Sequence, residues 1–89
     1  MDLTAIIQKT YVFSNDVSGY LGEIYFEPNG TIGRYNHPNE RTWTFEDKCL
    51  IVWGESKKRQ AKYNQCWKKN GKWHMEALWD QEGNKHYLV

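Results

Sequence analysis

The sequence contains only two cysteines, Cys49 and Cys66, which are too few to form the disulfide framework of a small disulfide-rich domain. Long apolar runs are also missing: the longest is LIVW at residues 50–53, whereas a membrane-spanning helix needs about 20 apolar residues. The opening segment, MDLTAIIQKT, has neither the basic stretch nor the long apolar stretch of a secretory signal peptide. These absences predict a cytoplasmic protein with reduced cysteines and no membrane segment.

Neither sign of charge dominates the chain, since 12 basic residues against 11 acidic ones leave a formal net charge of +1. No overall electrostatic field therefore drives the protein toward nucleic acid or an anionic membrane.

The sequence also lacks the residue spacing of a metal-binding motif. No close pair of a zinc motif occurs among the histidines and cysteines, which are His37, His74, His86, Cys49 and Cys66. We predict no metal and no cofactor.

Catalytic signatures are equally scarce. The chain has no G-x-S-x-G nucleophile motif, and neither cysteine belongs to a C-x-x-C pair that would activate it. His37 and Glu40 form one acid–base pair on one loop, so a hydrolase or isomerase is a remote alternative. The sequence therefore favours a protein that is not an enzyme.

Aromatic residues are abundant: the 89 residues include five tryptophans, six tyrosines and three phenylalanines. Such rings can build the core of a short chain, so we expect a single domain over residues 1–89. Residues 2–9 fit a short helix, because Asp2 can cap it and Ile6 and Ile7 extend one apolar face begun by Leu3. Over residues 10–89 the apolar period becomes two and turn-forming residues recur about every eight to twelve positions, which is typical of an antiparallel meander.

Between these turns we expect eight short strands. The Asn-Gly dipeptides at residues 29–30 and 70–71 supply the positive φ angles of tight hairpins, so they are the clearest local signals. The expected strands cover residues 10–13, 20–26, 31–35, 41–45, 49–53, 59–67, 72–79 and 85–89. The fold class predicted is all-β, a small antiparallel up-and-down β-barrel or barrel-like sandwich. Its edge strands would be the first and the last, which leaves a monomer and a homodimer both open.

Alternation along the strands assigns side chains to faces. The strand at 41–45 turns Trp43 inward, and the strand at 49–53 is apolar throughout, so we expect it to be central and covered on both faces. Tyr63 and Trp67 lie four residues apart on one expected strand, which puts both on the core face. Of the five tryptophans we expect most in the core and one or two at a cavity.

The densest group of polar and aromatic residues lies in TIGRYNHPNERTW, residues 31–43. Guanidinium, imidazole and amide groups can hold a polar ligand by directional hydrogen bonds, while aromatic rings stack on it. The candidate ligand-binding residues are Arg34, Tyr35, His37, Asn39, Glu40 and Trp43. The alternative is a purely structural turn that binds no ligand, in which Pro38 fixes the backbone and Glu40 pairs with Arg34 or Arg41. The residues alone leave both interpretations open.

A second group combines positive charge with aromatic rings between residues 57 and 72. Tyr63 and Trp67 interleave there with seven basic residues and no acid. The possible polyanion contacts are Lys57, Lys58, Arg59, Lys62, Lys68, Lys69 and Lys72. A single-stranded nucleic-acid groove needs such charges and stacking rings, but lysines around a hairpin tip also keep a strand edge soluble. We favour the solvated edge over a nucleic-acid site.

Several motifs together resemble a family of small all-β, lipocalin-like domains of bacteria. They are an N-G-x-I turn, a G-x-Y-x-H-x-N-E-x-x-W core, a strand like CLIVW and a closing H-x-L. The matching positions are Asn29, Gly30, Ile32, Gly33, Tyr35, His37, Asn39, Glu40, Trp43, His86 and Leu88. The resemblance implies an association with glycosyltransferases and other sugar-handling proteins, which a stand-alone chain would meet as partners in trans.

These features together predict a stand-alone binding module. Its expected ligand is a polar small molecule or a saccharide, bound at the barrel mouth by the residues of segment 31–43. The alternative is a protein or single-stranded nucleic-acid interaction module that uses the basic and aromatic stripe at residues 57–72.

Overall fold

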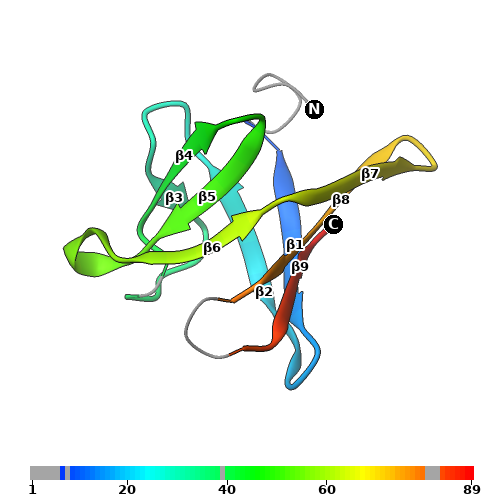
Figure 1. Cartoon of the computed structure of the whole chain (residues 1–89), viewed down its shortest axis with the longest axis horizontal. Coiled ribbons are helices and arrows are strands. Elements are labelled where there is room, and N and C mark those ends of the chain that lie inside the picture. The colour runs from blue at the N-terminus through cyan, green and yellow to red at the C-terminus, as the bar shows by residue number, and fades with distance from the viewer. Residues whose placement is uncertain (1–6, 8, 39, 80–82) are drawn as a thin grey trace.

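The computed structural model describes residues 7, 9–38, 40–79 and 83–89, and these residues form an all-β fold (Figure 1). Its strands are β1 Thr10–Asn15, β2 Gly19–Phe26, β3 Ile32–Gly33, β4 Thr42–Glu46, β5 Cys49–Trp53, β6 Arg59–Tyr63, β7 Gln65–Lys69, β8 Lys72–Leu78 and β9 Lys85–Leu88. A 3₁₀ turn, η1 Glu55–Lys57, connects β5 to β6. The helix predicted at residues 2–9 lies outside the described residues, apart from Ile7 and Lys9. Nowhere in the described ranges is there a helix with the length and apolar character needed to cross a membrane.

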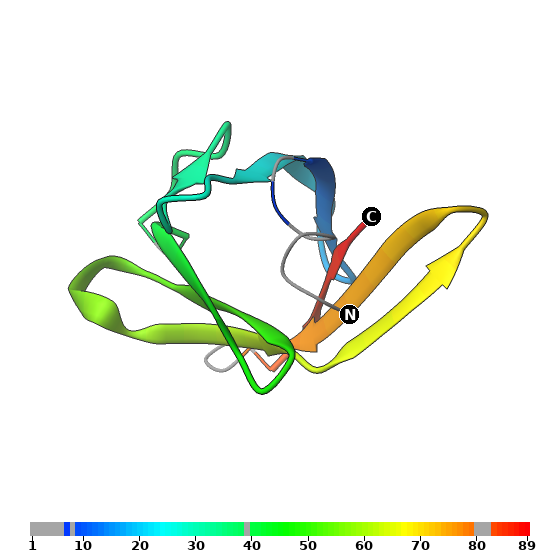
Figure 2. The same ribbon diagram turned by 90° about the horizontal axis from the view of Figure 1, so that it is seen from above.

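The strands belong to two antiparallel sheets that share one core. Six strands pair in the order β3-β2-β1-β9-β8-β7, and three pair in the order β4-β5-β6. The sheets meet at two corners, through a bridge between Thr31 and Thr42 and a bridge between Ala61 and Trp79. Figure 2 shows the strands arranged around the core, while the β7–β8 hairpin extends away from it. The described strands form no continuous closed barrel, so the closed form of the predicted barrel is wrong.

The first and last strands are neighbours rather than edges. In the β1–β9 pair, Phe13 lies opposite Leu88 and Asn15 lies opposite His86. The edge strands of the six-stranded sheet are β3 and β7. The prediction that β1 and β9 are the free edges is therefore wrong, because residues far apart in sequence pair across the sheet.

The strand predicted at residues 59–67 is two strands that belong to different sheets. The chain leaves the three-stranded sheet at Asn64, whose N–H bonds to the carbonyl of Lys62 at 3.1 Å, and β7 then joins β8. This change of sheet resets the alternation of faces. Tyr63 is therefore buried at 1% exposure, whereas Trp67 is 43% exposed. The prediction that both rings face the core is wrong for Trp67.

Other local predictions are confirmed. β5 has the predicted bounds and lies between β4 and β6, and its central residues, Leu50 to Val52, are all buried. Both Asn-Gly segments form hairpins, with Asn70 and Gly71 at positive φ between β7 and β8. β3, however, is only two residues long, because Arg34 has a φ of 64°, which ends the extended conformation.

The five tryptophans divide among three environments. Trp43 and Trp79 are buried in the core, Trp53 and Trp73 are half-buried, and Trp67 is exposed. Trp53 and Trp73 each line a hollow in the surface. Two tryptophans thus reach a cavity as predicted, but the prediction that most of them belong to the core is wrong.

The buried tyrosines predict a loss of stability in alkali. Burial raises the pKa of Tyr11 from 10.0 to about 12. Below pH 10 the hydroxyl is protonated in both states. Between pH 10 and pH 12 the unfolded chain loses this proton first, so the free energy of unfolding falls, by at most about 1.4 kcal/mol per pH unit. Urea unfolding across this window should show the fall, and Tyr11→Phe should make it shallower. An unchanged slope in that variant would contradict the burial of the hydroxyl.

Candidate functional site

The segment between β3 and β4 folds back on itself and is fastened to η1. Glu40 forms an isolated bridge with His37, in which the Glu40 N–H donates to the His37 carbonyl at 3.1 Å. The Glu55 N–H donates to the carbonyl of Pro38 at 2.8 Å. These bonds fasten the loop at His37, Pro38 and Glu40.

His37 and Glu40 form the central contact of this loop. His37 Nδ1 lies 3.1 Å from Glu40 Oε2, and the side chains are 48% and 6% exposed respectively. A buried carboxylate oxygen and a half-exposed imidazole nitrogen are thus at ion-pair distance, although the contact at Glu40 Oε2 is not a hydrogen bond. The arrangement places an imidazole at the surface next to a buried carboxylate.

Tyr35 completes the aromatic side of the site. Its ring lies at 25° to that of His37, with centroids 6.1 Å apart, and it meets the Phe13 ring edge-on at 5.2 Å. Gly22 on β2 permits this position, because a Cβ there would lie 3.1 Å from Cδ1 of Tyr35. Tyr35, His37 and Glu40 are therefore brought together by the fold.

The other predicted ligand residues are placed differently. Trp43 is part of the core, where its indole N–H donates to the Glu27 carbonyl at 2.9 Å. Arg34 is exposed on the surface, and Asn39 lies outside the described residues. Arg41, which could have paired with Glu40, instead bonds to Asn36 and to Glu55, at 2.9 Å and 3.3 Å.

A polar and aromatic interior that was not predicted as a site lies beside this loop. The buried Tyr63 is close enough to Glu40 that burial and then the charge of Glu40 raise the pKa of Tyr63 well above 10.0. Trp79 packs on the buried His86 with ring centroids 4.0 Å apart, and it meets Tyr63 edge-on at 6.3 Å. The sequence feature that could have identified His86 is the alternation along β9. This alternation puts His86 on the same buried face as the apolar Leu88.

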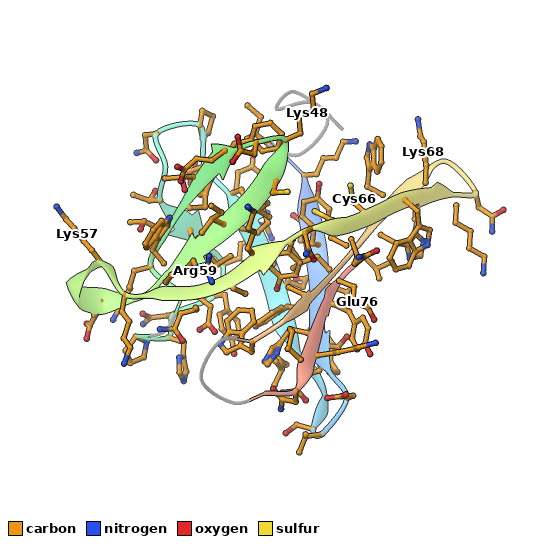
Figure 3. The ribbon with its side chains drawn as sticks, in the orientation of Figure 1. Lys48, Lys57, Arg59, Cys66, Lys68 and Glu76 are labelled. Atoms are coloured by element: carbon orange, nitrogen blue, oxygen red, sulfur yellow. The ribbon has the colours of Figure 1, made fainter. Side chains whose placement is uncertain are left out.

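The basic stripe at residues 57–72 does not form one surface. Figure 3 places Lys57 and Lys68 at opposite ends of the molecule, because η1 and the β7–β8 hairpin extend in opposite directions. The hairpin keeps exposed rings: Trp67 stacks on His74 with centroids 5.7 Å apart, and Lys68 Nζ lies 5.8 Å from the Trp73 ring. Lys57 and Lys58 lie at and after η1, Arg59 and Lys62 on β6, Lys68 and Lys69 on β7, and Lys72 on β8.

Two surface hollows are lined by residues outside the His37 loop. One, of about 290 Å³, is on the outer face of the three-stranded sheet and is lined by Thr42, Thr44, Trp53 and Lys57. The larger, of about 370 Å³, lies near the start of β1 and is lined by Lys9, Thr10, Tyr11, Gly71, Lys72, Trp73 and Val89. Neither hollow includes a residue that was predicted for the ligand site on segment 31–43.

The cysteines and potential metal ligands are dispersed. Cys49 and Cys66 are free thiols. In the part of the chain that the structure describes, no three His, Cys, Asp or Glu side chains gather in a group that could hold a metal ion.

No protein-family model, no curated protein and no solved structure matches the chain. The resemblance to lipocalin-like domains therefore stays a prediction. The functional argument rests on the geometry of the residues described above.

Proposed function

We propose that the chain is a binding module for a polar small molecule, with a saccharide preferred, that docks on His37 and Tyr35. The observation that carries the proposal is the contact of 3.1 Å between the half-exposed His37 and the buried Glu40. A sugar hydroxyl can exchange a hydrogen bond with the imidazole, while its C–H face lies on an aromatic ring. The resemblance to sugar-associated lipocalin-like domains supports the same ligand class.

The burial of Glu40 distinguishes this loop from an ordinary turn. Burying a carboxylate costs free energy that its hydrogen bonds must offset. A purely structural turn can be held by solvent-exposed ion pairs. The nearby pair of Arg41 and Glu55 is an example, with side chains 42% and 63% exposed. A buried carboxylate in contact with a surface imidazole is better explained by a need to hold that imidazole in place.

The test is a nuclear magnetic resonance titration with a panel of monosaccharides and oligosaccharides. Binding should shift the signals of Tyr35 and His37, and His37→Ala should weaken it by about tenfold, the value of one hydrogen bond of about 1.4 kcal/mol. His74→Ala is the matched control, because His74 is also half-buried and stacked on a ring, but on the β7–β8 hairpin. Signals of Tyr35 and His37 that never move, or equal effects of the two variants, would overturn the proposal.

One observation favours a second candidate function, an interaction module for a protein or single-stranded nucleic acid at the β7–β8 hairpin. Trp67 is 43% exposed and stacked on His74, and Lys68 and Lys69 follow it on the same strand. Exposed rings among positive charges can stack on bases while the charges neutralise phosphates. Steep weakening of binding by salt is the signature of the nucleic-acid form of this function.

A further inference from the structure

Trp53 lies on the outer face of the three-stranded sheet, turned away from the core. Among the described residues, the core cluster includes its neighbour on β5, Val52, but not Trp53 itself. Successive side chains of a strand point to opposite faces, so Trp53 shares the outer face with Thr42, its cross-strand partner on β4. The ring is half-buried and lines the hollow of about 290 Å³. Building the core therefore does not account for this tryptophan.

A second large apolar side chain lies on the same face. Ile51 is two residues before Trp53, and its cross-strand partner, Thr44, is exposed. Ile51 is only 6% exposed, although it too is outside the core cluster that the described residues form. The solvated face of an antiparallel sheet normally carries polar side chains. The outer face of β5 is instead apolar, with Ile51 covered and the ring of Trp53 partly accessible.

A hydrogen bond fixes the orientation of the Trp53 ring. Its Nε1–H donates to Thr44 Oγ1 at 2.8 Å, and the Thr44 hydroxyl donates in turn to Glu46 Oε2 at 3.0 Å. The polar edge of the indole thus has its partner within the protein. The ring therefore offers its apolar face to the hollow, which favours a flat ligand that can stack on it.

Positive charges border the hollow. Lys57 is one of its lining residues, and Arg59 lies opposite Trp53 on β6. Lys62 lies opposite Ile51, on the same outer face. Three basic side chains around one aromatic ring give this part of the surface a positive potential, which attracts an anionic ligand.

The two acids near the hollow are engaged elsewhere. Glu46 accepts the hydrogen bond from Thr44, and Glu55 is 3.3 Å from Arg41. Neither acid belongs to the described residues that line the hollow. The combination of a flat apolar ring and an ammonium group at the hollow therefore fits a ligand that is both planar and negatively charged.

We propose that this hollow binds a small aromatic carboxylate, with its ring stacked on Trp53 and its carboxylate at the ammonium group of Lys57. The hydroxyl of Thr42, which also lines the hollow, can donate a hydrogen bond to the same carboxylate. A volume of about 290 Å³ lies near the lower limit of roughly 300 Å³ for small-molecule sites, which suits a ligand of one or two rings. The lining residues do not include His37, so this proposal and the saccharide site can fail separately.

The first test is a nuclear magnetic resonance titration with naphthoate, and the neutral naphthamide is the matched control ligand. Naphthoate should shift the indole N–H signal of Trp53 and the amide signals of Thr42 and Thr44. Naphthamide should bind about fivefold more weakly, because it lacks the charge that Lys57 attracts. Equal binding of the two compounds, or a Trp53 signal that does not move up to the solubility limit of naphthoate, would overturn the proposal.

Charge variants give a second test that does not alter the sheet. Lys57→Gln removes the charge and should weaken naphthoate about fivefold, while naphthamide should change by less than about twofold. Lys68→Gln is the matched control, because Lys68 is 5.8 Å from the Trp73 ring but lies at the opposite end of the molecule (Figure 3). This variant should leave naphthoate binding within about twofold. Equal effects of the two variants would contradict the assigned position of the carboxylate.

A third comparison removes the stacking surface. Trp53→Leu should abolish the naphthoate-induced shifts of Thr42 and Thr44, whereas Trp67→Leu on the β7–β8 hairpin should preserve them. Preserved shifts in Trp53→Leu would overturn the proposal. If Trp53→Leu does not fold, the comparison of Lys57→Gln with Lys68→Gln still decides. A Trp53 signal that moves with neutral saccharides and not with naphthoate would assign the hollow to sugars and overturn the proposal.

Discussion

Trp79→Ala should lower the free energy of unfolding by about 3–5 kcal/mol, which is a large part of the stability of a small domain. Trp79 is 1% exposed and packs on His86, Phe13 and Tyr63. Its backbone also forms the bridge to Ala61 that joins the two sheets. Removing the indole leaves a cavity where the sheets meet, so the loss should be seen as a lower urea midpoint.

Trp67→Ala is the matched control for this large effect. The same atoms are removed, but Trp67 is 43% exposed on a hairpin that extends from the core. Its loss should cost no more than about 1 kcal/mol, most of it from the stacking on His74. A similar cost for the two variants would mean that the β7–β8 hairpin packs against the body of the domain in solution.

The local parts of the fold could be predicted because they depend on neighbouring residues. The bounds of β5 follow from a continuous apolar run, and the β7–β8 turn follows from Asn70 and Gly71, which both adopt positive φ. The break at Asn64 could not be predicted in this way. The residues before and after Asn64 are all compatible with a single strand. They form two strands only because β6 pairs with β5 and β7 pairs with β8.

In the candidate site, too, contacts within one loop could be predicted from the sequence, whereas contacts between distant segments could not. Tyr35, His37 and Glu40 lie within six residues of sequence, so their meeting was predictable from the loop alone. The approach of Tyr63 and Trp79 to this loop depends on the corner where the two sheets meet.

A double-mutant cycle on His37 and Glu40 is expected to give a coupling energy between about 1 and 3 kcal/mol, the upper part of the range for residues in direct contact. His37→Ala removes the imidazole from a carboxylate that is only 6% exposed, so the carboxylate loses a partner that water cannot fully replace. In a Glu40→Gln background the same change should cost much less. Urea unfolding of the four proteins measures the coupling.

The cycle on Arg41 and Glu55 is the matched comparison, because this neighbouring pair joins the same loop to η1 through side chains that are 42% and 63% exposed. Water screens such a pair, and its coupling should stay below about 1 kcal/mol. The two cycles should therefore differ although the contact distances are similar, 3.1 Å and 3.3 Å. Equal, small couplings would show that Glu40 does not hold His37 in place, and the ligand site proposed on that imidazole would lose its physical basis.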